Sequence, residues 1–567
     1  MPKTKRKLES PEQSRVKSQR LDKKKIAAQY IGPANKKIEA DAYIKEFCDK
    51  FQRPEDGIEW LLSNANMSVS EFFATKWEKS PLAMHSTENT AGRLEAVFSA
   101  AFLKKLLDTH KKQQFTKGFT YRIDFQAAKF VDGEYIEIDK KATNCLADGK
   151  SPVDFDQLEG FLKDGYTIQM PEPQRFQPAL HALMEPLESY FGALVTANAY
   201  LAPPGGQMRP PRFDNEDYFV LQTEGAQTWK LYQATVELAT QFSDTLSVNE
   251  IGKPKKTETL NPGDVLYMPR GTIFQTAAGP SATSAYVILS TYCEHHVGRF
   301  VRQAVGRLLH HVDQRSRVLH RPLPLGLMPR LCRPSLNEAY ADTLVSLAEA
   351  IRKTSTSSQW ENQLAMDSFV DPFMTCRLPP FRRQLYRDDV TITNRSRIQL
   401  HNKRHVAYYL RETEVDYADE EAGETPLLYK RSPKWRKASA SEVTSSRDED
   451  ENQRLAEKNR SVARADRDLS PKFTPDETGL RLAVFCSVYN DARLHRDYIT
   501  AGVNDNMATF HSGYITVLDQ LMAANEPLLV ADLAKSLDRN LNLTKFLKTL
   551  SNMGALDVIK ASSVPLD

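Results

Sequence analysis

The chain of 567 residues contains no run of 18 or more apolar residues and no signal-peptide pattern. These absences predict a protein that is neither membrane-spanning nor secreted, and no membrane partner is expected. There are only six cysteines and none has CxxC spacing, which argues against a zinc ribbon and against a disulfide scaffold. The residues that are present, 41% hydrophobic and 26% charged, are typical of an intracellular globular protein of at most about four domains.

An excess of charge of one sign is confined to the start of the chain. The net charge of the whole chain is +3, but residues 1–40 hold 12 Lys or Arg against 4 Asp or Glu. With few large apolar residues to bury, this segment is predicted to be a disordered basic tail. Short basic clusters of this kind indicate nuclear import or contact with nucleic acid, although a merely solubilising tail has the same composition.

The patterning changes twice along the first half of the chain. Residues 41 to about 95 have helical spacing, whereas 118–295 contain short alternating or apolar runs separated by Gly and Pro, with one helical insertion at about 176–192. Many short strands with turn signals are typical of a barrel or a two-sheet jelly roll. We therefore expect an α+β protein whose first folded domain spans residues 41–300.

Helical periodicity then returns over residues 301–370. Val297, Phe300, Val301 and Leu308 belong to one apolar stripe, and a second predicted helix begins at Ser335. Such stripes must be buried, either against the same chain or against a second copy in a homodimer, and periodicity does not separate the two.

Residues 371–567 are expected to form the last domain. Within it, residues 430–470 hold 19 charged residues in 41 and are predicted to be a disordered insertion. The end of the chain predicts three short helices and a strand at 556–559, a pattern typical of a winged helix. Because Asp538 and Asp557 accompany Lys545 and Lys548, a protein contact is favoured over DNA readout.

An ordered series of short motifs between residues 55 and 300 resembles the JmjC ribosomal oxygenases, the family of the Myc-induced nuclear antigen type and the nucleolar histidyl-hydroxylase type. The motifs are Trp77-Glu78-Lys79-Ser80-Pro81-Leu82, Asn198-Ala199-Tyr200-Leu201-Ala202-Pro203-Pro204, Pro210-Pro211-Arg212-Phe213-Asp214, Phe219-Val220-Leu221-Gln222-Thr223-Glu224-Gly225 and Pro262-Gly263-Asp264-Val265-Leu266-Tyr267-Met268-Pro269-Arg270-Gly271-Thr272-Ile273.

The resemblance implies a double-stranded β-helix of the cupin type that holds Fe(II) and 2-oxoglutarate. It implies hydroxylation of a histidyl side chain on a ribosomal protein, or demethylation of a histone lysine. It also implies a ribosomal-protein or histone-type peptide as partner, a helical dimerisation region behind the barrel, and location in the nucleus or nucleolus.

The residues at the implied iron site differ from the family pattern. The site needs two His and one carboxylate, with the first His and the carboxylate at i and i+2 of a strand. In this sequence these positions hold Arg212 and Asp214, and the second His position holds Phe274. Arginine and phenylalanine have no lone pair to give a metal. No histidine lies between His181 and His295 to replace them.

The implied cosubstrate pocket is also changed. Asn198 and Tyr200, which belong to it in the family, are retained, but the lysine that neutralises the distal carboxylate is replaced by Gln227. A threonine that helps hold the same carboxylate aligns with Ile288. A buried carboxylate without a cationic partner costs several kcal/mol. Weak or absent binding of Fe(II) and 2-oxoglutarate is therefore expected.

The sequence suggests three functions, and the first is favoured because two iron ligands and two cosubstrate contacts are replaced together. The first is a catalytically inactive pseudo-oxygenase that binds ribosomal or chromatin proteins. The second is an active 2-oxoglutarate-dependent hydroxylase or demethylase with an unconventional site. The third is a nucleic-acid-associated scaffold that uses the basic tail and the winged helix. For the vacated iron position, an internal ion pair between Arg212 and Asp214 and a water-filled cavity are both compatible with the sequence.

Overall fold

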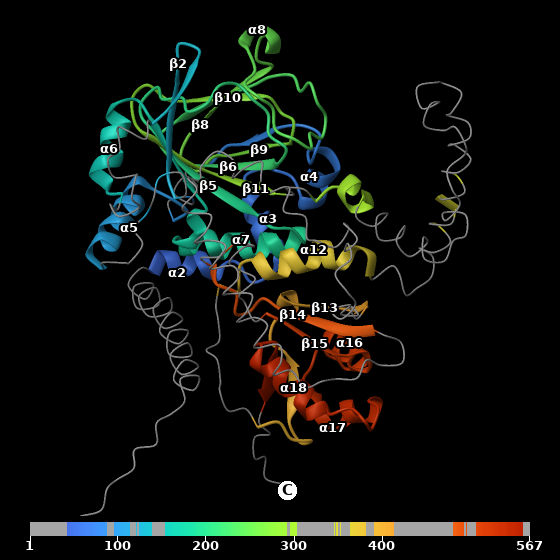
Figure 1. Cartoon of the computed structure of the whole chain (residues 1–567). Coiled ribbons are helices and arrows are strands. Elements are labelled where there is room, and N and C mark those ends of the chain that lie inside the picture. The colour runs from blue at the N-terminus through green and yellow to red at the C-terminus, as the bar shows by residue number, and fades with distance from the viewer. Residues whose placement is uncertain are drawn as a thin grey trace, which may run out of the picture. The chain divides into compact units, whose positions relative to one another are not determined.

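The computed structural model describes residues 42–87, 96–113, 124–138, 153–291, 295–302, 363–381, 391–412, 480–492 and 506–559, with a few single residues between them. The chain divides into two compact units, Met1–Glu294 and His295–Asp567. Among the helices within these ranges, none is both long enough and apolar enough to cross a bilayer. The units are described separately below (Figure 1).

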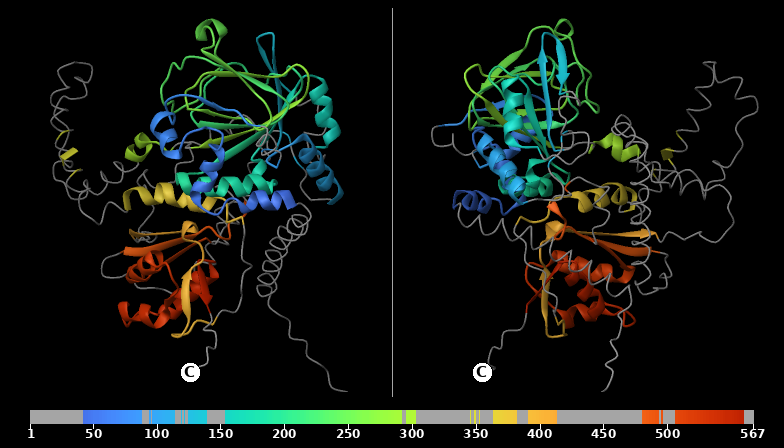
Figure 2. Two further views of the ribbon diagram at one scale, coloured as in Figure 1. Left: turned by 180° about the vertical axis from the view of Figure 1, so that it is seen from behind. Right: turned by 60° about the vertical axis from the view of Figure 1, so that its left-hand side comes forward.

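The first unit is built on two antiparallel sheets (Figures 1 and 2). The larger has the strand order β1-β9-β6-β11-β5-β4-β2-β3 and the smaller has β10-β7-β8. Their bounds are β1 Leu82–Met84, β2 Gln126–Val131, β3 Glu134–Glu137, β4 Thr167–Pro171, β5 Thr196–Ala202, β6 Asp217–Glu224, β7 Gln227–Leu231, β8 Lys256–Leu260, β9 Val265–Met268, β10 Phe274–Ala278 and β11 Ser284–Thr291. The order interleaves strands far apart in sequence, as the predicted jelly roll requires.

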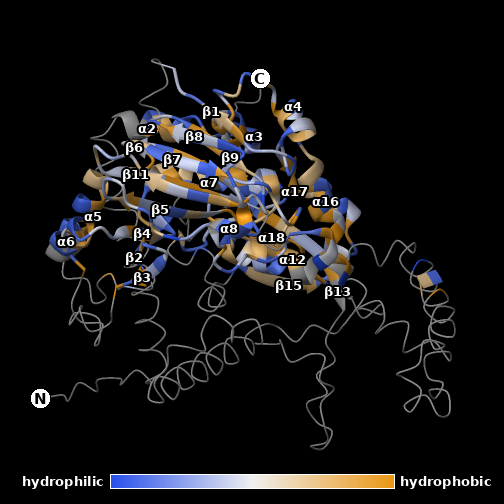
Figure 3. Ribbon diagram, turned by 90° about the horizontal axis from the view of Figure 1, so that it is seen from above, coloured by the Kyte–Doolittle hydropathy of each residue, from blue (hydrophilic) through white to orange (hydrophobic). Residues whose placement is uncertain are grey.

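Alternation along the strands explains why the two sheets enclose a core. In β7, Gln227, Trp229 and Leu231 are buried while Thr228 and Lys230 face outward, the period of two that a half-buried strand requires. Hydrophilic and hydrophobic residues accordingly occur side by side on the strands of the barrel (Figure 3). The central strand β11 is buried along its whole length, because it pairs with β5 on one side and β6 on the other.

Helices accompany the sheets of this unit. The long helix α7 is largely buried. It begins with Pro178, whose missing N–H costs nothing because the first amides of a helix have no partner within it, and it ends at Gly192, which adopts the left-handed conformation. It occupies the region where the sequence predicts a helical insertion. The bounds are α2 Ala42–Asp49, α3 Pro54–Leu61, α4 Val69–Thr75, α5 Ala100–Gln113, α6 Phe155–Lys163, α7 Pro178–Phe191 and α8 Val248–Ile251, with one 3-10 turn at Pro173–Arg175.

The second unit contains two further antiparallel sheets, β16-β12-β17 and β13-β14-β15. Strand β13 pairs in register with β14 although residues 413–479 separate them. The bounds are α12 Gln363–Cys376, β12 Arg397–Leu400, β13 Val406–Glu412, β14 Leu480–Cys486, β15 Met507–His511, α16 Ile515–Ala523, β16 Leu528–Leu529, α17 Val530–Leu533, α18 Leu543–Asn552 and β17 Leu556–Ile559, with 3-10 turns at Lys403–His405, Ser512–Tyr514 and Ala534–Ser536.

The helices predicted at the end of the chain are present as α16, α17 and α18, and the predicted strand is β17. Strands β12 to β16 were not predicted. Helix α12 begins within the region 301–370 that was predicted to be helical and extends beyond it. The helix predicted to start at Val297 is described only as far as residue 302. The basic tail, the helix expected from Ser335 and the insertion at 430–470 lie outside the described residues, so the proposed domain boundaries stay predictions.

Candidate functional site

The residues assigned to the iron position come together at one edge of the smaller sheet. Arg212 and Phe274 form an isolated antiparallel bridge, with Arg212 N to Phe274 O at 3.2 Å and Phe274 N to Arg212 O at 2.9 Å. Asp214 follows two residues later, outside any strand, and its carbonyl accepts from Gly271 N at 2.9 Å. The three side chains that the resemblance groups are therefore neighbours here.

Arg212 and Asp214 form an ion pair inside this edge. Arg212 Nε lies 3.1 Å from Asp214 Oδ1 and 3.0 Å from Oδ2, and the Tyr218 hydroxyl donates to Oδ2 at 2.8 Å. The two paired side chains are only 20% and 14% exposed. The guanidinium also lies over the Phe274 ring, 5.1 Å from its centroid. Of the two alternatives that the sequence left open, an internal ion pair and a water-filled cavity with both groups solvated, the structure has the internal pair.

The surroundings keep Arg212 charged and Tyr218 protonated. Burial by itself would lower the pKa of Arg212, but the adjacent Asp214 carboxylate overcomes this and raises the pKa above its ordinary value. Burial, followed by the negative charge of Asp214, raises the pKa of Tyr218 well above its usual value. Tyr218 is therefore a neutral hydroxyl donor to the carboxylate at any physiological pH.

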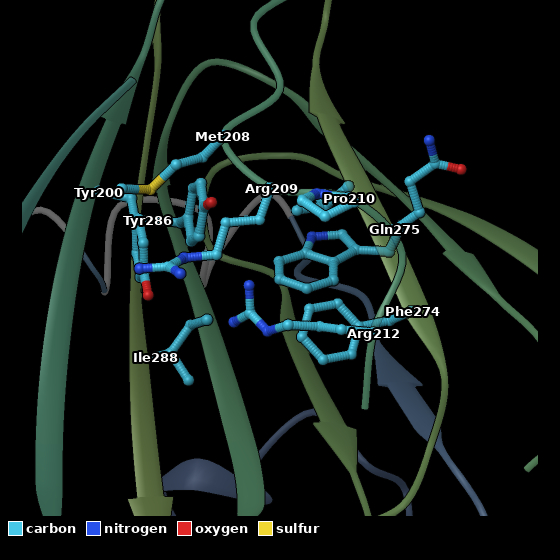
Figure 4. A pocket seen from close by; sticks show the side chains of 11 residues that line it. Tyr200, Met208, Arg209, Pro210, Arg212, Phe274, Gln275, Tyr286 and Ile288 are labelled. Carbon is cyan, nitrogen blue, oxygen red and sulfur yellow. The ribbon is translucent and has the colours of Figure 1, made fainter. Parts of the chain in front are cut away.

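Aromatic side chains fill the space between the two sheets. Tyr200 and Tyr286 stack with ring centroids 4.8 Å apart, and the Tyr286 ring meets Trp229 edge-on at 5.7 Å. Trp229 in turn lies 5.7 Å from the Phe274 ring. Trp229 is fully buried and Phe274 is 5% exposed. A cavity of about 20 Å³ is left among them, next to Arg209, Arg212 and Ile288 (Figure 4).

The four cosubstrate positions are divided between this cavity and the sheets around it. Tyr200 and Ile288 line the cavity. Asn198 is paired with Ile288 across strands β5 and β11, and its Oδ1 accepts from Gln169 Nε2 at 2.9 Å. Gln227 is buried on β7 and donates to Thr276 Oγ1 at 2.8 Å. Asn198 and Gln227 are thus engaged in hydrogen bonds within the sheets.

These residues do not fit the iron site of an oxygenase of this kind. Such a site takes two imidazole nitrogens and one carboxylate, whereas Arg212 and Phe274 offer no lone pair. Asp214 could serve as a ligand, but both of its oxygens face the guanidinium at hydrogen-bond distance. Within the described ranges, no three His, Cys, Asp or Glu side chains converge as a metal site would require.

The cavity does not fit 2-oxoglutarate either. A volume of about 20 Å³ holds about one water molecule, since a water needs roughly 10–15 Å³ by this kind of measure. Pockets that enclose a small organic ligand are about 300–1,000 Å³. Ile288 is 4% exposed and offers no donor to a carboxylate.

The histidines that flank the barrel sequence lie elsewhere. His181 lies in the first turn of α7, within the predicted helical insertion, and is 8% exposed. In the second unit, the His295 ring lies 5.3 Å from Phe369, and His296 Nδ1 accepts from Arg299 N at 3.2 Å at the start of a helix. None of the three lines the cavity.

Sequence reasoning missed four residues of the site. Tyr286 lies two residues before Ile288 on β11, so the strand period already indicates that both face the same side. Tyr218 is the second residue of β6, but the segment that links it to Asp214 is irregular, so no strand period indicates that the two side chains meet. Arg209 and Trp229 line the cavity but gave no signal, because one lies in a proline-rich loop and the other is an ordinary core aromatic by composition.

Comparison with known proteins identifies the first unit. The family model described as "JmjC domain" matches residues 169–294. Ribosomal oxygenase 2 of Rattus norvegicus is 32% identical to this chain, over 58% of this chain and 66% of its own length. Ribosomal oxygenase 2 of Bos taurus is 31% identical, over 62% of this chain and 71% of its own length. The match thus spans about two thirds of the length of the rat relative.

A more distant relative is the bifunctional lysine-specific demethylase and histidyl-hydroxylase NO66 of Drosophila willistoni, 27% identical over 57% of this chain and 40% of its own. Among solved structures, the Escherichia coli ribosomal oxygenase YcfD aligns over 87% of this chain and 99% of its own at 12% identity and a TM-score of 0.35. That superposition is too loose to assign any residue.

Proposed function

The chain belongs to the JmjC family of ribosomal oxygenases, and from this premise we propose that it is a pseudo-oxygenase. Its barrel binds a segment of a ribosomal or chromatin protein without Fe(II)- and 2-oxoglutarate-dependent turnover. The names of its relatives point to ribosomal proteins and histones as the class of partner. The single observation that carries the proposal is the distance of 3.0–3.1 Å from Arg212 Nε to both oxygens of Asp214.

Replacement of a metal by a guanidinium explains how the barrel stays folded without a cofactor. A lone buried carboxylate is unfavourable, and a cationic neighbour with a second hydrogen-bond donor compensates for its desolvation. Arg212 and Tyr218 fill these two roles for Asp214. The aromatic cluster of Tyr200, Tyr286 and Phe274 supplies the rest of the packing.

The experiment is a turnover assay with two variants. Purified wild-type protein is given Fe(II), ascorbate, 2-oxoglutarate and histone or ribosomal-protein peptides, and succinate release is measured. We expect no release above a protein-free control, and metal binding to be regained in the double variant Arg212→His with Phe274→His. Succinate release by the wild type that is lost in Asp214→Ala would establish the alternative, an active hydroxylase or demethylase with an unconventional site.

The elements of the second unit support two finer assignments within this proposal. A winged helix consists of three helices and a small sheet, and this unit supplies them as α16, α17 and α18 with strands β16, β12 and β17. We assign this winged helix to contact with a protein. The helix that begins at Val297 exposes Val297, Phe300 and Val301 at 77%, 44% and 46%, and we assign this face to a homodimer contact. Sedimentation equilibrium of the wild type and of Val297→Glu tests the dimer.

The basic tail supports two further proposals. One is location in the nucleus, and more narrowly in the nucleolus; the other is contact with nucleic acid. Residues 1–40 carry a charge of +8, from 12 basic and 4 acidic residues. A tail that neutralises phosphates gives an affinity that falls linearly with the logarithm of salt concentration. Deletion of residues 1–40 should reduce both RNA affinity and this slope. An unchanged slope would remove the tail from nucleic-acid binding.

A further inference from the structure

The cavity of the barrel is surrounded by hydrogen-bond donors and cations. Its eleven lining residues include the two guanidiniums of Arg209 and Arg212, the indole of Trp229 and the phenols of Tyr200 and Tyr286, and they include no Asp or Glu. Figure 4 shows the guanidiniums of both arginines reaching into the space beside Tyr286 and Ile288. A cavity lined in this way is suited to an acceptor, not to a second donor.

One of these donors has no acceptor among the described residues. Trp229 is fully buried, and its Nε1 is without a hydrogen-bond partner there. Arg212 contacts Asp214 through Nε alone, so its terminal nitrogens are not used in the ion pair. A buried donor that has lost its water and found no acceptor is unfavourable. The buried indole N–H of Trp229, beside the guanidinium of Arg212, indicates a missing acceptor at this cavity.

The local charge sets the kind of acceptor. Arg209 and Arg212 contribute two positive charges at the cavity, and Asp214 contributes one negative charge through its pair with Arg212. One further negative charge would neutralise the group, whereas a dianion would leave an uncompensated buried charge. A planar carboxylate matches the planar guanidinium fork. One of its oxygens can take the place of the single water for which the cavity has room. We therefore favour a carboxylate over a phosphate.

The surroundings of the cavity favour a carboxylate carried by a peptide. Arg209 lies over the ring of Tyr135 on β3, 5.7 Å from its centroid, and Tyr135 is 37% exposed. On another side, the segment 234–247 runs along residues 211–215, with Ser243 N donating to Phe213 O at 2.9 Å. This segment exposes Phe242 at 71%. Exposed aromatic groups beside a cationic cavity fit apolar residues on either side of an acidic one.

We propose that this cavity binds the carboxylate of a Glu or Asp side chain in a partner peptide, held by Arg209, Arg212 and Trp229. The inference rests on the proposed function, because it names the chemistry by which the non-catalytic barrel recognises its partner. The aromatic side chains on β3 and on segment 234–247 contact the flanking residues of the peptide. No chemical step is involved.

The indole resonance of Trp229 provides a direct test. The chain has five tryptophans, so the indole region of a ¹H–¹⁵N spectrum has five signals. The signal that disappears in Trp229→Phe is that of the Trp229 indole. The full-length protein is titrated with acetyl-Leu-Glu-Leu-amide, with its Gln counterpart, and with acetate. We expect the Glu peptide to shift the Trp229 signal saturably, the Gln peptide to have no effect, and acetate to bind more weakly than the Glu peptide.

Two variants with the same change of charge separate the cavity from general electrostatics. Arg209→Gln should lower the affinity for the Glu peptide about tenfold, which is the loss expected for one charge-assisted hydrogen bond. Lys230→Gln, on the outward face of β7 next to Trp229, should leave affinity unchanged. The remaining indole signals report whether each variant is folded.

Three results would overturn the inference. The Glu peptide at millimolar concentration could leave the Trp229 signal unshifted, the Glu and Gln peptides could bind equally, or Arg209→Gln and Lys230→Gln could lose the same affinity for the Glu peptide. Acetate binding as tightly as the Glu peptide would also overturn it, because the site would then hold a free carboxylate. Each of these outcomes leaves the absence of turnover untouched, so the proposed function is tested separately by succinate release.

Discussion

Arg212 Nε lies within 3.1 Å of both carboxylate oxygens of Asp214, and the pair is enclosed at the edge of the smaller sheet. Arg212→Ala should therefore lower the free energy of unfolding, because it leaves Asp214 buried without a cation. We expect a loss of about 3 kcal/mol, the low end for breaking a buried pair, since Tyr218 still donates to Oδ2. Chemical denaturation measures it.

The control for this loss is Lys230→Ala, which removes an exposed cation from strand β7 and should change stability by less than about 0.5 kcal/mol. Arg212→Ala combined with Asp214→Ala should recover part of the loss, because the orphaned charge is gone. An Arg212→Ala protein as stable as the wild type would mean that the pair has no structural role.

Asp217 is a second buried carboxylate in the barrel, and it predicts a pH dependence of stability. It is fully buried on β6, accepts from the Tyr267 hydroxyl at 2.9 Å, and lies 3.9 Å from Arg270 Nε. Burial raises the pKa of Asp217 to about 6, which the Tyr267 hydrogen bond and Arg270 only partly offset. The folded protein therefore holds this proton more tightly than the unfolded chain.

Because the folded pKa is raised, the stabilisation is present below the unfolded pKa of about 3.9 and is lost as pH rises through about 6. Two pKa units correspond to about 3 kcal/mol. Asp217→Asn should remove this loss, so the variant should gain stability relative to wild type between pH 4 and 7. Thermal unfolding across this range measures the difference. The exposed Asp244→Asn is the control, and parallel curves for wild type and Asp217→Asn would refute the assignment.

Gly271 makes the turn beside the Arg212–Phe274 bridge possible. Its φ is +85°, and a Cβ at this position would lie 2.3 Å from the Val236 carbonyl oxygen. Gly271→Ala should therefore destabilise the barrel by several kcal/mol. Gly252 has φ +70° but open space around it, so Gly252→Ala should cost only about 1–2 kcal/mol for the left-handed backbone. Equal melting temperatures for the two variants would show that the contact with Val236 O relaxes freely.

The strands of the first unit could be predicted because their signal is local. The run Tyr218–Leu221 lies within β6 and the run Tyr286–Leu289 within β11, and both follow from β-branched and aromatic residues between turns. The Arg212–Asp214 pair was one of two alternatives that the sequence left open, and it was based on the i, i+2 spacing of a strand. Arg212 belongs only to an isolated bridge and Asp214 to no strand, so the two side chains meet without the regular strand that the expectation assumed.

The remainder could not be predicted because it depends on long-range pairing. Strand β13 acquires its partner β14 from beyond residues 413–479, and no local period signals such a pairing. In the site, Arg209 reaches the cavity from a loop, and the unsatisfied indole of Trp229 exists only because the opposite sheet encloses it. Sequence patterns identify which side chains are apolar, but not which polar atoms are left without partners after packing.

The central claim is that Arg212 and Phe274 leave the barrel without a metal site. The most direct measurement is a titration of the apo-protein with Mn(II), a stand-in for Fe(II), followed by the electron paramagnetic resonance signal of free Mn(II). The wild type should leave this signal undiminished at millimolar concentration, while the double variant Arg212→His with Phe274→His should bind about one equivalent. One equivalent bound by the wild type, and lost in Asp214→Ala, would contradict the account.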